Sequence, residues 1–262
     1  MNTKNYFSSD FKLGIVGGGQ LGKMLLQETR RLDIATAVLD PSETAPSRIA
    51  SNSFSQGSLT DFDTVYDFGK SCDLITIEIE NVSVEALKKL ESEGKKVFPQ
   101  PALIELIQSK ISQKNFYQEH AIPTADFQAF ENLNQLKTAL NEGQWTLPFV
   151  WKQSKGGFDG RGVAMIRKAE DLNDLPDVPC LAEMLIPFEK ELAVVVARSE
   201  SGECQSFPTV EMDFHPEANL VEYVFSPGKV EAAISAQAQE LALMVAQKLN
   251  IVGILAVEMF LS

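Results

Sequence analysis

Short apolar segments alternate with helical segments through the first hundred residues of the chain. "LGIVGG" and "ATAVLD" are predicted to be short buried strands, and the intervening "LGKMLLQETRRL" places apolar residues at helical spacing. "DFDTVYDFGKSC" predicts a second helix and "DLITIEIE" a strand, while "VEALKKLESEG" and "KVFP" predict another helix and strand. This alternation predicts a doubly wound α/β domain over residues 1–107, with helices on both faces of a parallel sheet.

The pattern changes from Pro101 onward. One helix is predicted over "ALIELIQSKISQKNFYQEH", and a hairpin is predicted from "LPFVWKQ" and "VAMIR". Strand-like segments follow: "CLAEMLIP", "ELAVVVARS", "SFPTVEMDF" and "NLVEYVF". An amphipathic helix, with an apolar face from Ile234 to Leu249, precedes a last strand, "IVGILAVEMFL". Consecutive strands joined by short links predict antiparallel sheets, so this part of the chain is expected to be α+β.

Charge and cysteine content limit the partners and the compartment. The chain of 262 residues has a formal net charge of -13, which disfavours binding to nucleic acid or to anionic lipid. Its three cysteines are far apart and have no metal-ligand spacing, which is typical of reduced thiols. The N-terminal segment has no apolar targeting region, and no apolar run has the length of a membrane span. We therefore expect a cytoplasmic protein without a nucleic-acid or membrane partner, in which local basic clusters bind any polyanionic ligand.

The first of two glycine-rich loops is "GGGQLG". It satisfies the pattern G-x-G-x-x-G with Gly17, Gly19 and Gly22, it lies between a predicted strand and a predicted helix, and Asp40 ends the next strand. Backbone N–H groups at a helix N-terminus suit an anionic group, so the loop is compatible with NAD or FAD binding. A tight strand-to-helix turn without a dinucleotide is the alternative.

The second glycine-rich loop is "KQSKGGFDGRG", which joins the two strands of the predicted hairpin. Its glycines allow backbone N–H groups to approach phosphate oxygens closely. Lys152, Lys155 and Arg161 add positive charge in an otherwise acidic chain. Phosphate binding is therefore favoured over a long hairpin loop with solvated charges.

Acidic residues within strand-like segments are candidate ligand contacts. Glu191 begins "ELAVVVARS" and Glu258 interrupts the apolar "ILAVEMFL", where a carboxylate is costly unless it is paired. Glu258 is favoured as a metal ligand over a structural acid, with magnesium as the companion of a triphosphate. Glu78 and Glu80 share one face of "ITIEIEN" at its C-terminal end, where doubly wound sheets bind ligands. That pair is equally compatible with binding ribose hydroxyls and with a solvated sheet edge.

Several segments, in this order, resemble one enzyme family along almost the whole chain. They are "GIVGGGQLGKML", "ITIEIENV", "SKISQKNF", "KQSKGGFDGRG", "AEMLIPFEKELAVVVAR", "FPTVEMDFHPEANLVEYVFSP" and "VGILAVEMF". The resemblance is to the 5-(carboxyamino)imidazole ribonucleotide synthetase family of the ATP-grasp superfamily, which acts in purine biosynthesis. The combination of "GGFDGRG" with "GGGQLGKML" is its most specific part.

The resemblance implies a fold and an activity. The fold is a doubly wound pre-ATP-grasp domain over 1–107, a small flap domain over 108–182 and an incomplete larger domain over 183–262, with ATP between the last two. The activity is the carboxylation of 5-aminoimidazole ribonucleotide. ATP phosphorylates bicarbonate, and the resulting carboxyphosphate carboxylates the exocyclic amine, with release of ADP and phosphate. ATP, Mg²⁺ and a homodimer in the cytoplasm are further expectations.

The resemblance also implies roles for the residues that bind ATP and magnesium. Lys110 and Lys152 match lysines that contact the ATP phosphates, Glu191 matches the acid that holds the ribose, and Glu258 matches the first magnesium ligand. A nucleotide-site histidine matches His215. The adenine-holding segment matches Glu183, Met184, Leu185 and Ile186. The flap over the phosphates matches Gly156, Gly157, Phe158, Asp159, Gly160, Arg161, Gly162 and Val163.

The acceptor substrate has its own set of matching residues. Those expected to face the aminoimidazole ribonucleotide are Gln20, Glu78, Asp159 and Arg161. The expected catalytic residues are Lys152, Asp159 and Arg161.

The chain departs from the family pattern at its C-terminal end. Family members continue past the last strand into a second magnesium glutamate, an asparagine and a loop near the bicarbonate, whereas this chain stops at Ser262. We expect a truncated chain, or one whose missing part is supplied separately. Another ATP-grasp ligase with a different acceptor, an ATP-binding fragment without turnover, and an NAD-dependent oxidoreductase are the alternatives.

Overall fold

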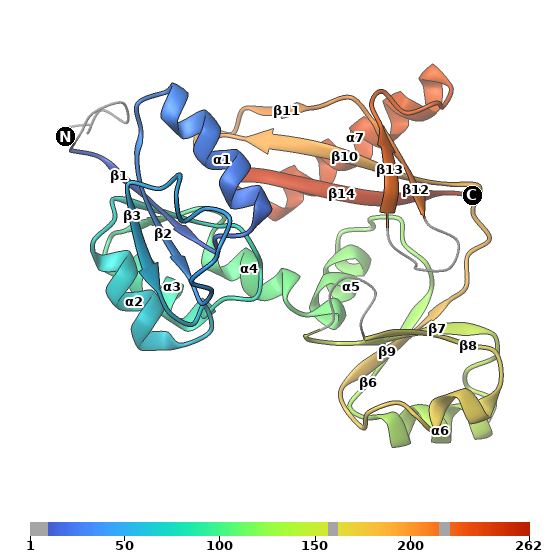
Figure 1. Cartoon of the computed structure of the whole chain (residues 1–262). Coiled ribbons are helices and arrows are strands. Elements are labelled where there is room, and N and C mark those ends of the chain that lie inside the picture. The colour runs from blue at the N-terminus through green and yellow to red at the C-terminus, as the bar shows by residue number, and fades with distance from the viewer. Residues whose placement is uncertain (1–9, 157–161, 215–220) are drawn as a thin grey trace. The chain divides into compact units, whose positions relative to one another are not determined.

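The strands of the N-terminal part pair in parallel, as the alternating sequence pattern predicts. The computed structural model describes residues 10–156, 162–214 and 221–262, and the chain divides into two compact units, 1–105 and 106–262. Within the described residues of the first unit, a parallel sheet has the order β3-β2-β1-β4-β5 (Figure 1). Its strands are β1 (Lys12–Val16), β2 (Ala35–Asp40), β3 (Ser53–Gln56), β4 (Leu74–Ile77) and β5 (Lys96–Val97).

Helices cover both faces of this sheet, because successive strand residues point to opposite sides. On one face, Ile15 and Val38 pack with Leu26 of α1. On the other face, Val16 and Leu39 belong to the buried cluster that includes apolar residues of α2 and α3. The helices are α1 (Gln20–Arg31), α2 (Phe62–Lys70) and α3 (Val84–Ser92). The doubly wound prediction is therefore confirmed.

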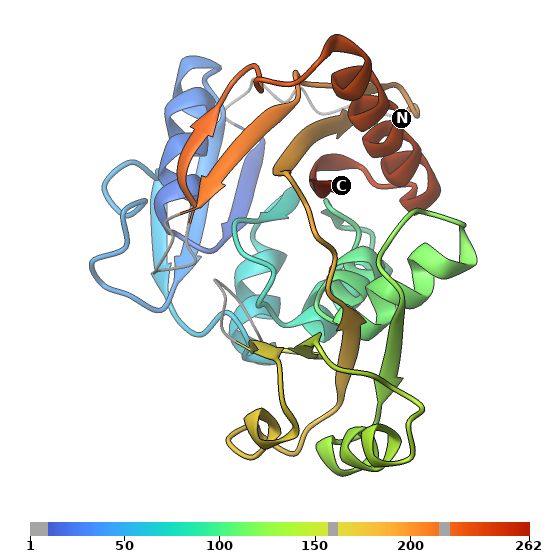
Figure 2. The same ribbon diagram turned by 90° about the vertical axis from the view of Figure 1, so that its right-hand side faces the viewer.

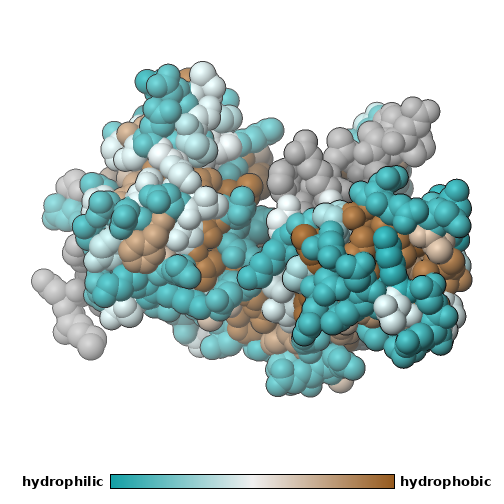
Figure 3. Space-filling model, turned by 90° about the horizontal axis from the view of Figure 1, so that it is seen from below, coloured by the Kyte–Doolittle hydropathy of each residue, from teal (hydrophilic) through white to brown (hydrophobic). Residues whose placement is uncertain are grey.

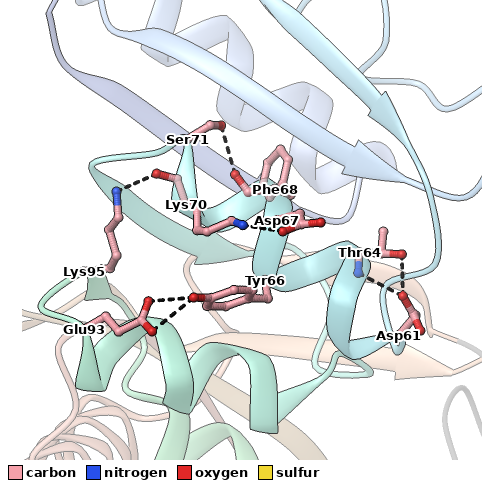
Figure 4. Close-up of polar contacts among 9 residues, drawn as sticks. All are labelled: Asp61, Thr64, Tyr66, Asp67, Phe68, Lys70, Ser71, Glu93 and Lys95. Carbon is pink, nitrogen blue, oxygen red and sulfur yellow. Dashed lines mark hydrogen bonds and ion pairs between the residues drawn. The ribbon is translucent and has the colours of Figure 1, made fainter.

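Polar contacts fix α2 and its neighbours on the second face (Figure 4). The Asp61 side chain caps α2 by accepting a hydrogen bond of 2.9 Å from the Thr64 backbone N–H. The Tyr66 hydroxyl donates to the Glu93 carboxylate, with O···O distances of 2.9 and 3.1 Å, and this contact raises the pKa of Tyr66. The Lys95 ammonium donates to backbone carbonyls at the end of α2. These contacts lie at the surface and orient α2 against the segment that follows α3.

A four-stranded antiparallel sheet lies in the second unit, as the described residues show it. Its order is β6-β9-β7-β8. The strands are β6 (Phe127–Phe130), β7 (Phe149–Gln153), β8 (Val163–Ile166) and β9 (Cys180–Met184), and the 3-10 helix η1 (Ala169–Leu172) precedes β9. Helix α6 (Leu133–Asn141) covers one face of this sheet, where Leu136 packs with Phe149, Trp151 and Ile166 (Figure 1). The predicted hairpin of β7 and β8 is confirmed.

The prediction of one continuous helix after Pro101 is wrong. Two helices, α4 (Pro101–Ile107) and α5 (Lys110–Glu119), replace it. Ser109 has extended backbone geometry, and its side chain accepts a hydrogen bond of 3.2 Å from the Ser112 N–H, so it caps α5. The Lys110 N–H donates to the carbonyl oxygen of Ser154 at 2.8 Å. In a continuous helix this N–H would instead donate to the carbonyl oxygen four residues earlier. The start of α5 is thereby joined to the end of β7.

The second sheet of this unit is also antiparallel and is organised around β10 (Lys190–Arg198). It contains β11 (Cys204–Ser206), β12 (Val210–Phe214), β13 (Val221–Phe225) and β14 (Gly253–Leu261). Strand β14 pairs with β10 along its whole length, and α7 (Ala232–Leu249) packs against both strands (Figure 2). The predicted single strand "SFPTVEMDF" is instead divided between β11 and β12, because Pro208 has no N–H to donate to a neighbouring strand.

The surface is largely polar where Figure 3 shows it. On the face shown in Figure 3, hydrophilic side chains surround smaller hydrophobic areas. Among the residues that the structure describes, no helix combines the length and the apolar character that crossing a membrane requires.

The predicted boundary between residues 182 and 183 stays a prediction, and β9, which spans it, belongs to the four-stranded sheet.

The core beneath α3 gives a stability prediction for the first unit. Leu87 is fully buried, so Leu87→Ala should lower the free energy of unfolding by about 2–5 kcal/mol, through lost burial and the cavity that remains. Lys88→Ala is the matched control, because Lys88 makes an exposed ion pair with Glu105 that should contribute only about 0–1 kcal/mol. Urea denaturation followed by circular dichroism measures both. Equal losses for the two variants would contradict the assigned packing.

Candidate functional site

A cavity of about 630 Å³ lies in the second unit. Among the described residues, charged side chains from both sheets and from α5 line it: Lys114, Lys152, Glu183, Glu191 and Glu258. Tyr117 and Ile186 also line it, together with apolar residues of α7 and β14. The structure therefore brings together the predicted residues Lys152, Glu183, Ile186, Glu191 and Glu258, which come from three separate regions of the sequence.

The strand pairing of β7 and β9 explains how two of these charges meet. Val150 lies opposite Glu183, and Lys152 lies opposite Leu181, so Lys152 and Glu183 are diagonal neighbours on one face. Trp151 points to the other face, where it is buried against α6. The alternation of "FVWKQ" thus places one face in the core under α6 and the other face in the cavity.

Glu183 forms the most buried polar contact of the cavity. One oxygen, Oε2, lies 3.0 Å from the Nζ atom of Lys152 and 3.1 Å from the Nζ atom of Lys114. The side chains of Glu183 and Lys114 are only 8% and 11% exposed, whereas that of Lys152 is 24% exposed. A single buried carboxylate therefore balances two ammonium groups, and the three side chains together carry one net positive charge.

Lys114 is a site residue that the sequence analysis missed. It lies four residues after Lys110 in α5, and its ammonium also donates to the Thr124 hydroxyl and lies 5.8 Å from the centre of the Phe127 ring. Burial lowers the pKa of Lys114, an effect that the Glu183 carboxylate opposes. The spacing of two lysines at i and i+4, on one helix face, is the signal that was available in the sequence.

Two carboxylates form the second polar part of the cavity. Glu258 on β14 lies opposite Ala193 of β10, and Glu191 lies opposite Phe260, so the two acids are diagonal neighbours. The pKa of Glu191 is raised, first by burial and then by the nearby Glu258 charge, while Lys152 acts in the opposite direction. Burial and the charges of Glu183 and Glu258 also raise the pKa of Tyr117. This arrangement favours a bound cation, because a positive charge relieves the repulsion between the two acids.

The loop between β7 and β8 is described at its two ends. The Gln153 N–H donates to the carbonyl oxygen of Gly162 at 2.8 Å, which closes the base of the loop. Gly156 and Gly162 have φ values of 79° and 70°, a region that favours glycine, and Val163 begins β8. The Lys110 backbone lies at this base through its bond to Ser154.

Part of the predicted site lies outside the described residues. These positions are Gly157, Phe158, Asp159, Gly160, Arg161 and His215. Within the predicted adenine segment, Glu183 and Ile186 line the cavity, while Met184 and Leu185 are 47% and 37% exposed.

The first glycine-rich loop belongs to the other unit and holds one of the chain's own carboxylates. The prediction that Glu78 and Glu80 share a strand face is wrong, because β4 ends at Ile77 and both residues follow it. The Glu78 carboxylate lies against the loop. A Cβ atom on Gly19 would be 2.5 Å from its Oε1 atom, and one on Gly17 would be 2.8 Å from its Oε2 atom. Gln20 is the first residue of α1 and is exposed.

This geometry disfavours the dinucleotide interpretation. Glu78 occupies the position at the N-terminus of α1 where a pyrophosphate would bind, and its negative charge would repel one. Asp40, the acid of the dinucleotide pattern, instead accepts hydrogen bonds of 2.7 and 2.8 Å from the N–H groups of Gly18 and Ser42. The loop and Glu78 lie at the C-terminal ends of β1 and β4, where the strand order reverses. That position is typical of ligand sites in doubly wound sheets.

Comparison with known families agrees with this description. The ATP-grasp domain matches residues 115–262, and the ribonucleotide synthetase preATP-grasp domain matches residues 11–108. The chain therefore belongs to the ATP-grasp family.

Two curated relatives with known names are similar to this chain over almost its whole length. The chain is 33% identical to the N5-carboxyaminoimidazole ribonucleotide synthase of Bacillus subtilis, over 95% of this chain and 66% of the relative. It is 36% identical to a phosphoribosylaminoimidazole carboxylase of Candida albicans, over 95% of this chain and 45% of the relative. The chain thus spans between about half and two thirds of the length of these curated relatives.

Solved structures show the same fold with ligands. The carboxyaminoimidazole ribonucleotide synthase of Aspergillus clavatus complexed with ATP matches with a TM-score of 0.87 and 33% identity, over 98% of this chain and 67% of that chain. The same fungal enzyme in complex with ADP and 5-aminoimidazole ribonucleotide matches with a TM-score of 0.85 and 32% identity, over 95% of this chain and 66% of that chain.

The raised pKa of Glu191 gives a prediction about pH and stability. Its pKa in the folded state exceeds the ordinary value of 4.5, so the folded protein holds this proton more tightly than the unfolded chain does. The penalty for ionising Glu191 is therefore absent below pH 4, grows as the pH rises through the folded pKa, and is complete above it. In metal-free buffer, Glu191→Gln should be more stable than the unchanged protein at pH 7, and the difference should shrink toward pH 4.

Thermal unfolding between pH 4 and pH 8 with a chelator present measures this difference. Glu189→Gln is the control, because Glu189 is exposed in the loop before β10. A stability gain for Glu191→Gln that is the same at every pH would contradict the electrostatic explanation.

Proposed function

We propose that this chain acts in the ATP- and bicarbonate-dependent carboxylation of 5-aminoimidazole ribonucleotide to 5-(carboxyamino)imidazole ribonucleotide, in purine biosynthesis. The observation that carries the proposal is the cavity in the second unit, where Lys152, Glu183, Glu191 and Glu258 line one space within a chain of the ATP-grasp family. The names of the curated relatives and the ligands in the fungal structures support this choice of reaction.

ATP is the proposed ligand of the cavity. Lys152 reaches it from β7, and Lys110 lies where α5 meets the base of the glycine-rich loop, so both are assigned to the phosphates. The segment Glu183–Ile186 is assigned to adenine and Glu191 to the ribose. The segment Gly156–Val163 is assigned to the flap that covers the phosphates, and His215 is assigned to the nucleotide site. Positive groups around the transferred phosphoryl group stabilise the charge that develops on it.

Magnesium fits the acidic part of the cavity. Carboxylate oxygens are the ligands that Mg²⁺ prefers, and the neighbouring charge of Glu258 already raises the pKa of Glu191. No group of three or more acidic, histidine or cysteine side chains suited to a metal occurs among the described residues, so phosphate oxygens and water would complete the coordination. Glu258 is the proposed protein ligand. When bound, the ion would neutralise charge on the triphosphate.

The acceptor chemistry follows from the family resemblance. A bicarbonate oxygen attacks the γ-phosphorus of ATP, and ADP leaves. The exocyclic amine then bonds to the carbon of the resulting carboxyphosphate, loses a proton, and inorganic phosphate leaves. Gln20 and Glu78, with Asp159 and Arg161, are assigned to the aminoimidazole ribonucleotide, and Lys152, Asp159 and Arg161 to catalysis. A closed loop over the site would protect the carboxyphosphate from water.

The proposal extends to assembly and compartment. We assign the protein to the cytoplasm as a homodimer, with small-molecule substrates. Light scattering of the purified chain measures the assembly state.

Lys152 gives the most direct test of nucleotide binding. Lys152→Ala should weaken Mg-ATP binding about 10- to 100-fold, because a charge-assisted contact to phosphate contributes about 1.5–3 kcal/mol. Isothermal titration calorimetry measures the affinity, and Lys248→Ala, at an exposed position near the end of α7, is the matched control. An unchanged affinity for Lys152→Ala would remove Lys152 from the phosphate site.

Turnover is tested by phosphate release from Mg-ATP, with and without bicarbonate and aminoimidazole ribonucleotide. We expect release that requires both additions. Release that needs bicarbonate and a different amine would indicate another ATP-grasp ligase. Binding of ATP without any release would show that the chain holds the nucleotide but does not catalyse the reaction.

A further inference from the structure

The buried cluster of Lys114, Glu183 and Lys152 contains a charge that the roles assigned above do not use. Lys114 carries no assigned role, although its side chain is 11% exposed and lines the cavity. Lysine is seldom buried unless it is paired, and burial lowers the pKa of this one. A helix position in α5 that faced solvent would avoid this penalty. The placement of Lys114 therefore requires an explanation.

The two lysines of the cluster differ in how firmly they are held. Lys114 has a second polar partner, the Thr124 hydroxyl, and its ammonium lies near the Phe127 ring. Lys152 is more than twice as exposed, at 24%, and it lies one residue before the end of the strand that leads into the glycine-rich loop. Lys114 is thus a fixed partner of Glu183, and Lys152 is the lysine with access to the open part of the cavity.

The charge balance shows what a fixed partner achieves. A lysine that moves toward a phosphate loosens its contact with the carboxylate to which it is paired. If Lys152 were the only partner of Glu183, its departure would leave a buried carboxylate without a counter-charge, which is strongly unfavourable. Because the same Oε2 atom already has Lys114 at 3.1 Å, Glu183 stays paired when Lys152 moves away.

We propose that Lys114 is a positioning residue that neutralises Glu183 and so releases the charge of Lys152 for the phosphates of a nucleoside triphosphate. This inference rests on the proposed function, because it requires that the cavity bind ATP. Lys114 acts through Glu183 and Lys152 and contacts no reacting atom. Its effect is therefore specific to the phosphate part of the ligand.

The test compares ATP with adenosine. Lys114→Met should weaken ATP binding roughly 10- to 100-fold, because Lys152 becomes the only counter-charge of Glu183. Adenosine binding should change less than about threefold, since adenosine has no phosphate to recruit Lys152. Lys137→Met, which removes a lysine of α6 outside the cavity, is the matched control. Calorimetric titration of the full chain provides each affinity.

A second variant separates charge balance from simple damage to the fold. In Lys114→Met/Glu183→Gln the buried carboxylate charge is absent, so Lys152 is free without help from Lys114. The ratio of ATP affinity to adenosine affinity should return to within about threefold of the unchanged protein. Equal weakening of ATP and adenosine by Lys114→Met, or no recovery in the double variant, would overturn the inference.

The outcomes also separate this inference from the proposed function. If the unchanged protein does not bind ATP, the proposed function fails and the inference fails with it. If the unchanged protein binds ATP and Lys114→Met binds it equally well, the proposed function stands and the role of Lys114 is refuted.

Discussion

The cavity of the second unit depends on the ion pairs that the Glu183 carboxylate makes with Lys114 and Lys152. Its Oε2 atom joins a lysine of α5 to a lysine of β7, while Glu183 itself belongs to β9. The buried carboxylate and the buried Lys114 ammonium each need the other, so α5 and β9 cannot separate without leaving an unpaired charge. The cluster also provides local positive charge in a chain whose formal net charge is -13. An anionic ligand therefore meets a basic site that the bulk charge of the protein does not offer.

The strand alternation of the two antiparallel sheets determines which charges reach that site. Phe149 and Trp151 are buried beneath α6, which leaves Lys152 for the opposite face. Glu191 and Glu258 meet because β10 and β14 pair along their whole length. The cost of bringing two acids together is visible in the raised pKa of Glu191. The proposed site for a cation and a polyanion is thus built from acidic residues that repel one another when no cation is bound.

Much of the fold could be predicted because its elements are strongly periodic. The parallel sheet, the β7–β8 hairpin and the antiparallel pairing all follow from local patterns of apolar residues. The break between α4 and α5 could not be predicted from the helical pattern, since it depends on a bond from Lys110 to Ser154, 44 residues along the chain. Lys114 was missed because a lysine on a helix is usually solvated, and its spacing from Lys110 indicates a shared helix face but not the buried partner Glu183. The dinucleotide pattern was misleading for a related reason: the partner of the glycines is Glu78, which lies on a different strand end.

The contact between Glu78 and the first glycine-rich loop has a consequence for how the glycine motif is interpreted. The space beside Gly19 is already filled by the Glu78 carboxylate, so a side chain at position 19 would have to displace the end of this acid. The glycines of this loop therefore make room for an acid of the chain itself, and a motif search that assigns them to a bound cofactor would name the wrong partner.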